Sequence, residues 1–109
     1  MFKQEKCVPC QGGVPPLNAD EIKKFKKLIS PYWSVENNMK LSKEFRFDSY
    51  KKAINFSNLV ANLAEDQAHH PYIHINFKVV NIILFTHKIN GLHENDFLMA
   101  NKIDNLKIK

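Results

Sequence analysis

The segment Glu65-Asp66-Gln67-Ala68-His69-His70-Pro71 marks a change in the chain from a helical pattern to an extended one. Pro71 disfavours the helical conformation for the residue before it, so a helix that enters this segment should end close to His69. Residues 72–86 are rich in Ile, Val and Phe without a helical period, which is typical of two short strands. The pattern therefore predicts a helix-to-strand corner followed by an antiparallel hairpin that folds near Phe77–Val79.

Histidines gather on both sides of this hairpin. Thr86-His87 ends it and Gly91-Leu92-His93-Glu94-Asn95-Asp96 follows, so four of the five histidines lie in the quoted segments. A hairpin of this kind places the position opposite His70 close to His87. We therefore expect His69, His70 and His87 to converge, although no Asn-Gly or Gly-Gly pair fixes the turn.

Three imidazoles in one place suit a reaction that needs a proton donor and a proton acceptor together. The unperturbed pKa of imidazole, roughly 6.5, lets this side chain play both parts near neutral pH. Three histidines can also hold a catalytic zinc ion, but adjacent residues such as His69 and His70 usually point in different directions. A purely structural corner is the third interpretation. The pattern favours proton transfer.

Two carboxylates are placed to support these histidines. Glu65 lies one helical turn before His69, at a spacing that allows a hydrogen bond to the imidazole. Asp96 falls on the third residue of a predicted helix, where carboxylates cap the helix start, and a carboxylate held there can also reach a histidine. A solvent-facing glutamate and an ordinary cap remain open as explanations. His74, inside the first strand of the hairpin, is expected to face solvent.

In their order and spacing, Glu-x-x-x-His-His-Pro at 65–71, Thr-His at 86–87 and Gly-Leu-x-x-x-Asp at 91–96 resemble the pterin-4a-carbinolamine dehydratases. The sequence at residues 91–100 is similar to that of the bacterial branch of this family and reads Gly-Leu-His-Glu-Asn-Asp-Phe-Leu-Met-Ala. The resemblance extends over residues 15–104. It implies dehydration of 4a-hydroxytetrahydrobiopterin to quinonoid dihydropterin, in tetrahydropterin recycling. The family needs neither a metal nor a redox cofactor for this reaction.

The resemblance also implies roles for single residues. His69 and His87 would be the proton-transfer pair, and His70 would mainly grip the pterin. Trp33 matches a family tryptophan that lies beside the pterin pocket, whereas its own sequence context favours plain core packing. His93 replaces the Ser or Thr cap of animal-type relatives, so we leave it outside the core site. The residues implied as substrate-binding or supporting are Glu65, Asp96, Trp33, Pro71 and Thr86.

The family resemblance further implies partners. Its members form dimers and tetramers, so we expect a homo-oligomer, with a functional link to an aromatic amino acid hydroxylase. Animal relatives also serve as dimerisation partners of a transcription factor, so a protein-interaction module that acts as a transcriptional coactivator is the alternative function. The net charge of +5, from 16 basic and 11 acidic residues, permits loose attraction to nucleic acid. Nothing in the lysine pattern makes a base-reading element, so binding to nucleic acid is not expected.

Helical and strand periodicities alternate along the chain and predict an α+β domain. Asn18 and Asp48 are the expected caps of the first two helices. The order α-β-β-α-β-β-α predicts a four-stranded antiparallel sheet with three helices on one face, and the two open sheet edges favour oligomer formation. The predicted elements are a helix over 18–30, strands over 33–36 and 40–47, a helix over 48–68, two strands within 72–86 and a helix over 94–106.

Residues 1–17 are predicted to be a mobile arm ahead of a single domain over 18–109. Cys7-Val8-Pro9-Cys10 has the spacing of half a zinc site or of a redox pair. No second half of a zinc site follows, which favours a functionally silent arm. No apolar run approaches the roughly 18 residues of a membrane span, and the first residues lack the apolar core of a signal peptide. These patterns predict a cytoplasmic protein.

Overall fold

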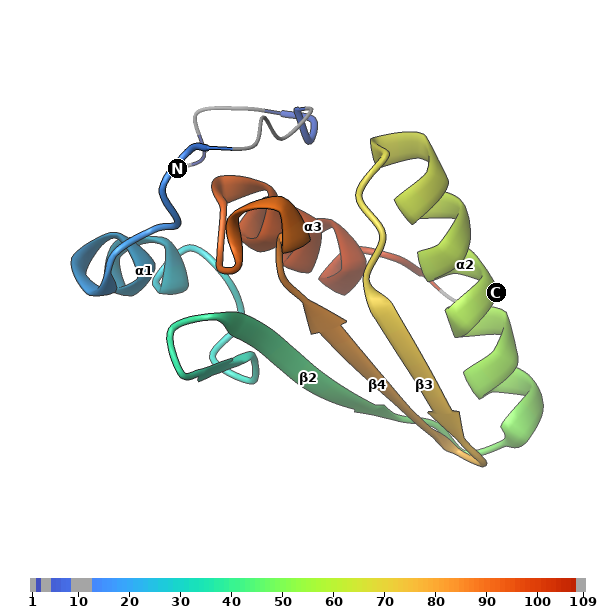
Figure 1. Ribbon diagram of the computed structural model, residues 1–109. Helices are drawn as coiled ribbons and strands as arrows, with labels where there is room; N and C mark the ends of the chain where they lie inside the picture. Colours follow the sequence, from blue (N-terminus) through green and yellow to red (C-terminus); the bar gives the residue numbers. More distant parts are fainter. Residues whose placement is uncertain (1, 3–4, 9–12, 108–109) are drawn as a thin grey trace.

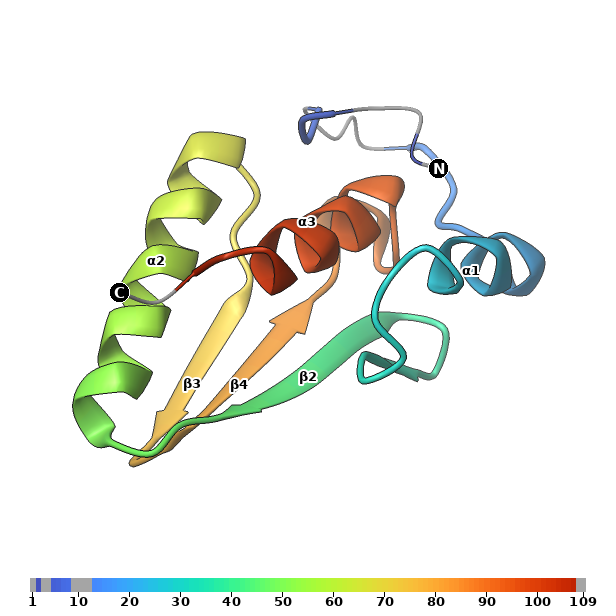
Figure 2. The same cartoon turned by 180° about the vertical axis from the view of Figure 1, so that it is seen from behind.

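The computed structural model describes residues 2, 5–8 and 13–107. Within them, three helices cover one face of a four-stranded antiparallel sheet with the strand order β1-β2-β4-β3 (Figures 1 and 2). The predicted fold class and element order are confirmed. The elements are α1 (Ala19–Lys26), β1 (Ser34–Glu36), β2 (Lys40–Arg46), α2 (Tyr50–Gln67), β3 (Tyr72–Asn76), β4 (Val79–Leu84), the 3₁₀ helix η1 (His87–Ile89) and α3 (Glu94–Asp104).

The first helix begins as predicted and ends earlier. The Asn18 side chain accepts the Glu21 backbone N–H, and the Glu21 carboxylate accepts the Asn18 N–H, both at 2.9 Å. Helix α1 ends at Lys26 rather than at residue 30. The Leu28 N–H then bonds the carbonyl of Phe25, three residues back, at 2.9 Å. This tighter turn closes the helix before Pro31.

Two other helix ends also differ from the prediction. Ser49, not Asp48, caps α2, because its hydroxyl accepts the Lys52 N–H at 3.1 Å while Asp48 pairs with the Lys52 ammonium. Helix α3 ends at Asp104 instead of Leu106. Helix α2 is 18 residues long but mixes apolar and charged residues. Among the described residues, no helix is long and apolar enough to cross a membrane.

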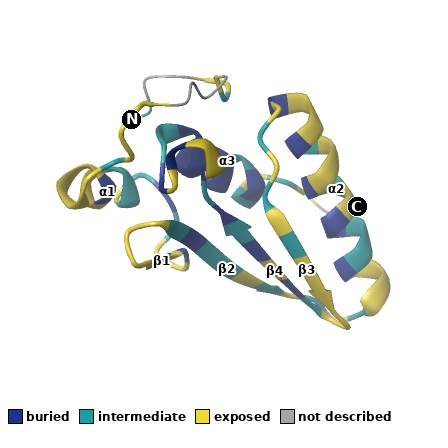
Figure 3. Ribbon diagram, in the orientation of Figure 1, coloured by how far each residue is buried: buried dark blue, intermediate teal, exposed yellow. Residues whose placement is uncertain are grey.

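The core lies between the sheet and the helices. The inward residues of the central strand β4, which are Val80, Ile82 and Leu84, are fully buried. Figure 3 shows the matching buried stripe of α2 and the mostly buried α3 above the sheet. Strand β4 therefore lies under α3, and the chain leaves its end directly toward Thr86 and η1.

The hairpin of β3 and β4 folds where the sequence indicated. The pairs run from Asn76 with Val79 to Tyr72 with Ile83, so Phe77 and Lys78 form the turn. Phe77 adopts a positive φ of 53° there, a conformation that normally favours glycine, so a phenylalanine holds the turn position and the sequence carried no turn signal. If this register is extended by two residues, Phe85 faces His70. The hairpin thus brings the corner after α2 beside the segment that holds His87.

Candidate active site

The corner after α2 has a defined backbone geometry. Ala68 adopts the left-handed conformation, with φ 53° and ψ 37°. Its N–H bonds the Glu65 carbonyl at 3.3 Å, and the His69 N–H bonds the Ala64 carbonyl at 3.2 Å. These two bonds are the Schellman motif, which satisfies the last carbonyls of a helix and turns the chain away from it. His69 therefore no longer continues the helical face that carries Glu65.

His69 is held by a buried carboxylate. Its Nε2 lies 2.7 Å from Oδ1 of Asp96, and Asp96 has no exposed surface. The other oxygen, Oδ2, accepts the Thr86 hydroxyl at 2.8 Å and the His93 backbone N–H at 3.0 Å. Asp96 thus caps α3 and binds a histidine at the same time. An ionised carboxylate can only accept hydrogen bonds, which assigns the hydrogen of this contact to Nε2 of His69 and leaves Nδ1 as the acceptor atom of a neutral ring.

Glu65 pairs with a different histidine from the predicted one. Its Oε1 lies 2.7 Å from Nε2 of His70, and both side chains are exposed. The predicted bond to His69 assumed that the helix continues for one more turn. The left-handed conformation of Ala68 ends the helical spacing, so the prediction named the wrong histidine as the partner of Glu65.

His87 begins η1 at the end of the hairpin. Its Nε2 lies 3.2 Å from the hydroxyl of Tyr72. The imidazole packs on the ring of Phe85, with 4.1 Å between centroids, and meets the ring of Tyr72 edge-on. His87 itself is exposed, so its ring is oriented by neighbours while remaining open to a ligand.

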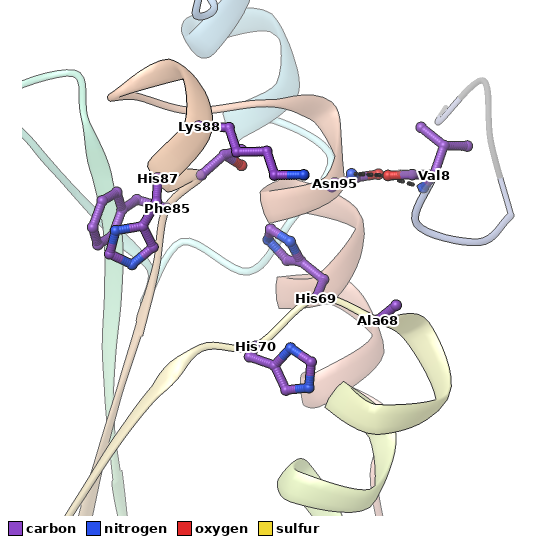
Figure 4. Close-up of a pocket in the computed structure, with 9 residues that line it drawn as sticks. Val8, Ala68, His69, His70, Phe85, His87, Lys88 and Asn95 are labelled. Atoms are coloured by element: carbon purple, nitrogen blue, oxygen red, sulfur yellow. Dashed lines mark hydrogen bonds between the residues drawn. The ribbon is translucent and has the colours of Figure 1, made fainter. Parts of the chain in front are cut away.

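All three histidines open onto one cavity of about 380 Å³ (Figure 4). The predicted convergence is therefore confirmed. A cavity of this size suits a small ligand, since binding pockets span roughly 300–1,000 Å³. The side chains that line it are Val8, Ala68, His69, His70, Phe85, Thr86, His87, Lys88 and Asn95.

Sequence reasoning missed five of these lining residues, one of which is Ala68, directly before His69. Phe85 and Lys88 directly flank Thr86-His87, so the end of a predicted strand was a usable signal for them. Asn95 directly precedes the predicted site residue Asp96, so its position in the sequence was also a usable signal. Val8 had no local signal, because only the folding of the N-terminal segment onto α3 brings it to the cavity.

The two remaining predicted site residues lie apart from this cavity. Trp33 is 1% exposed, and its indole N–H donates to Oδ2 of Asp104 at 2.8 Å. It packs edge-on against Phe45 in the core, the arrangement that its sequence context favoured. Pro71 does not line the cavity either, and it continues the chain from His70 into β3.

The histidines have separate partners, namely Asp96, Glu65 and Tyr72. In the part of the chain that the structure describes, no three side chains of His, Cys, Asp or Glu are grouped to hold a metal ion. Cys7 is a free thiol. The interpretation of Cys7 and Cys10 as part of a functionally silent arm remains a prediction, because Cys10 lies outside the described residues.

The family model for "Pterin 4 alpha carbinolamine dehydratase" matches residues 15–106. A protein of Alkaliphilus metalliredigens, named "Putative pterin-4-alpha-carbinolamine dehydratase", is 44% identical over 101 residues, covering 93% of this chain and 91% of the relative. A protein of the same name from Rickettsia canadensis is 43% identical over 104 residues, covering 95% of each chain.

A solved structure leads to the same group. The "transcriptional coactivator/pterin dehydratase" of Brucella melitensis superposes with a TM-score of 0.75 at 28% identity, covering 82% of this chain and 95% of the other. The family match includes the histidine corner, Thr86-His87 and Asp96. The chain belongs to the pterin-4a-carbinolamine dehydratase family.

Proposed function

We propose that this protein dehydrates 4a-hydroxytetrahydrobiopterin to quinonoid dihydropterin by histidine acid-base catalysis. It would act in tetrahydropterin recycling beside an aromatic amino acid hydroxylase. The observation that carries the proposal is that His69 and His87, from separate segments, line one small cavity while Asp96 holds His69 from behind.

The reaction needs two proton transfers. The bond between carbon 4a and its hydroxyl oxygen breaks as that oxygen gains a proton and leaves as water. Nitrogen 5 loses its proton, and its electron pair forms the double bond to carbon 4a. One imidazole gives the first proton and another takes the second, each step contributing roughly 10²- to 10⁴-fold to the rate.

The surroundings of the His69 and His87 imidazoles differ in a way that suits one for the role of base and the other for the role of acid. The Asp96 carboxylate stabilises the imidazolium that forms when His69 takes a proton through Nδ1, so His69 suits the base at nitrogen 5. His87 contacts the Tyr72 hydroxyl and lies against the rings of Phe85 and Tyr72, where it suits the acid. His70, oriented by Glu65, would bind the pterin, and Phe85 would pack on it.

Turnover of synthetic 4a-hydroxytetrahydrobiopterin tests this function. The wild-type protein should accelerate dehydration, and His87→Ala should lower kcat by about 10²- to 10⁴-fold. Its unfolding midpoint should change little, because His87 is exposed.

The matched control is His74→Ala, which removes an exposed histidine of β3 that does not line the cavity. This variant should keep full activity. A wild-type protein without any acceleration would contradict the dehydratase function and leave the alternative, a protein-interaction module of the kind that the Brucella protein's name includes.

We also propose that the protein forms a homo-oligomer through β3. This strand is at one edge of the sheet, and three exposed apolar residues lie on it or on its turn, namely Tyr72, Ile75 and Phe77. Sheet edges of this kind pair readily with another chain unless a charge blocks them. Sedimentation should give a multiple of the 12.7 kDa chain mass, and Ile75→Lys should reduce it. A 12.7 kDa wild-type species would contradict the proposal.

A further inference from the structure

The N-terminal segment Cys7–Val8 is attached to the start of α3 by the side chain of Asn95. The Val8 N–H donates to Oδ1 of Asn95 at 2.9 Å, and Nδ2 of Asn95 donates to the Val8 carbonyl at 2.7 Å, as the dashed lines in Figure 4 show. Asn95 is only 1% exposed. A buried amide that matches both polar groups of one backbone residue fixes the position of that residue.

A second buried amide holds the residue before it. Oε1 of Gln67 accepts the Cys7 N–H at 2.9 Å, and Gln67 is 6% exposed. The Cys7 thiol also donates to the backbone carbonyl of Asn95 at 3.7 Å. Gln67 is the last residue of α2 and Asn95 is the second of α3. The segment therefore bridges the two helix ends that carry the His69 and Asp96 pair.

The pKa of the Cys7 thiol indicates that the segment lies close to Asp96. The pKa of Cys7 is raised from 9.0 to about 11, chiefly by burial and also by the nearby charge of Asp96, against a smaller opposite effect of Lys102. The thiol is thus neutral near pH 7 and suits packing rather than nucleophilic chemistry. The effect of the Asp96 charge on its pKa places the Cys7 thiol near this buried carboxylate.

Val8, whose backbone is hydrogen-bonded to Asn95, reaches the cavity with its side chain. Its side chain is 44% exposed and is one of the cavity's lining groups. Figure 4 shows Val8 beside Asn95, on the opposite side of the site from Phe85 and His87. The cavity consequently has an apolar group on each side, one from the end of β4 and one from the N-terminal segment.

We infer that the Cys7–Val8 segment is a wall of the ligand pocket, in which Val8 contacts the substrate and limits its substituents, while Asn95 and Gln67 are positioning residues that hold the wall. This inference rests on the proposed function for the identity of the substrate. The anchoring contacts themselves do not depend on it.

The first test compares two exposed valines. Val8→Trp fills space at the wall, so KM for 4a-hydroxytetrahydrobiopterin should rise by about 10-fold or more while kcat and the unfolding midpoint change little. Val14 is 42% exposed and does not line the cavity, so Val14→Trp should leave both constants unchanged. Equal KM values for the two variants would overturn the substrate-contacting role of Val8.

The second test does not require turnover. In a Cys10→Ser background, iodoacetamide labels Cys7, and the reaction should be slow at pH 8 because the thiol is half-buried and protonated. Asn95→Ala should accelerate labelling by at least about 10-fold, since the segment loses two hydrogen bonds. Asn101→Ala, farther along α3, should not. An unchanged labelling rate in Asn95→Ala would overturn the anchored wall.

Bound ligand separates this inference from the proposed function. If the protein fails to dehydrate the carbinolamine, the proposed reaction is wrong, but slow labelling that Asn95→Ala accelerates still supports the wall. Saturating 7,8-dihydrobiopterin should slow the labelling of Cys7 further in the wild-type background. Labelling that this pterin leaves unchanged would overturn the placement of the segment against the pterin.

Discussion

His69→Ala should lower kcat for 4a-hydroxytetrahydrobiopterin by about 10²- to 10⁴-fold, because the substitution removes one of the two proposed proton-transfer groups. The loss should appear in kcat more than in KM, since His70 and Phe85 would still contact the ligand. Stopped-flow measurement of single turnovers would separate the chemical step from substrate binding.

His69→Gln is the matched control for this prediction. A glutamine amide can still donate a hydrogen bond toward Oδ1 of Asp96, so the carboxylate keeps a partner, but an amide cannot exchange a proton near neutral pH. We expect His69→Gln to be nearly as slow as His69→Ala and more stable to urea. A His69→Gln enzyme with kcat within about twofold of wild type would show that His69 only fills space beside Asp96.

The parts of the site that local chemistry determines were predictable from the sequence. Pro71 ends helical geometry by steric exclusion, so the corner was placed to within a few residues. The capping position of Asp96 follows from the spacing between its carboxylate and the start of α3. Pairing of the apolar strands then brings His87 toward the corner, because an antiparallel hairpin leaves little freedom of register.

The parts that depend on one unusual backbone conformation or on distant contacts were not predictable. A positive φ is uncommon for residues other than glycine, and nothing in the sequence indicates one at Ala68. Because the chain turns there, Glu65 forms its hydrogen bond with His70 instead of His69. The attachment of Val8 to Asn95 joins residues 87 positions apart through one amide. No periodicity or motif in residues 1–17 indicates it.

Asp96 connects the stability of the domain to the chemistry of the site. One carboxylate oxygen of Asp96 is hydrogen-bonded to His69, and the other accepts the Thr86 hydroxyl and the backbone N–H of His93, which precedes α3. Thr86 and Gly91 also exchange backbone bonds at this point, Thr86 N–H to Gly91 carbonyl at 2.9 Å. The loop that carries His87 is therefore tied to the same carboxylate that orients His69.

Asp96→Ala should consequently lower the free energy of unfolding by about 3–5 kcal/mol, because one buried and two partly buried donors lose their acceptor together. The same variant should lose most of its activity even where it stays folded, since His69 and the loop of His87 both lose their support. Urea unfolding and turnover of the carbinolamine at low temperature measure the two effects separately.

Asp20→Ala is the control that isolates burial from helix capping. Asp20 also lies in the first turn of a helix, but it is exposed on α1 and does not line the cavity. Its loss should cost about 0.3–1 kcal/mol through the helix dipole and leave kcat unchanged. If Asp96→Ala cost no more than Asp20→Ala, the carboxylate would be an ordinary cap, and the positioning of His69 would have to come from elsewhere.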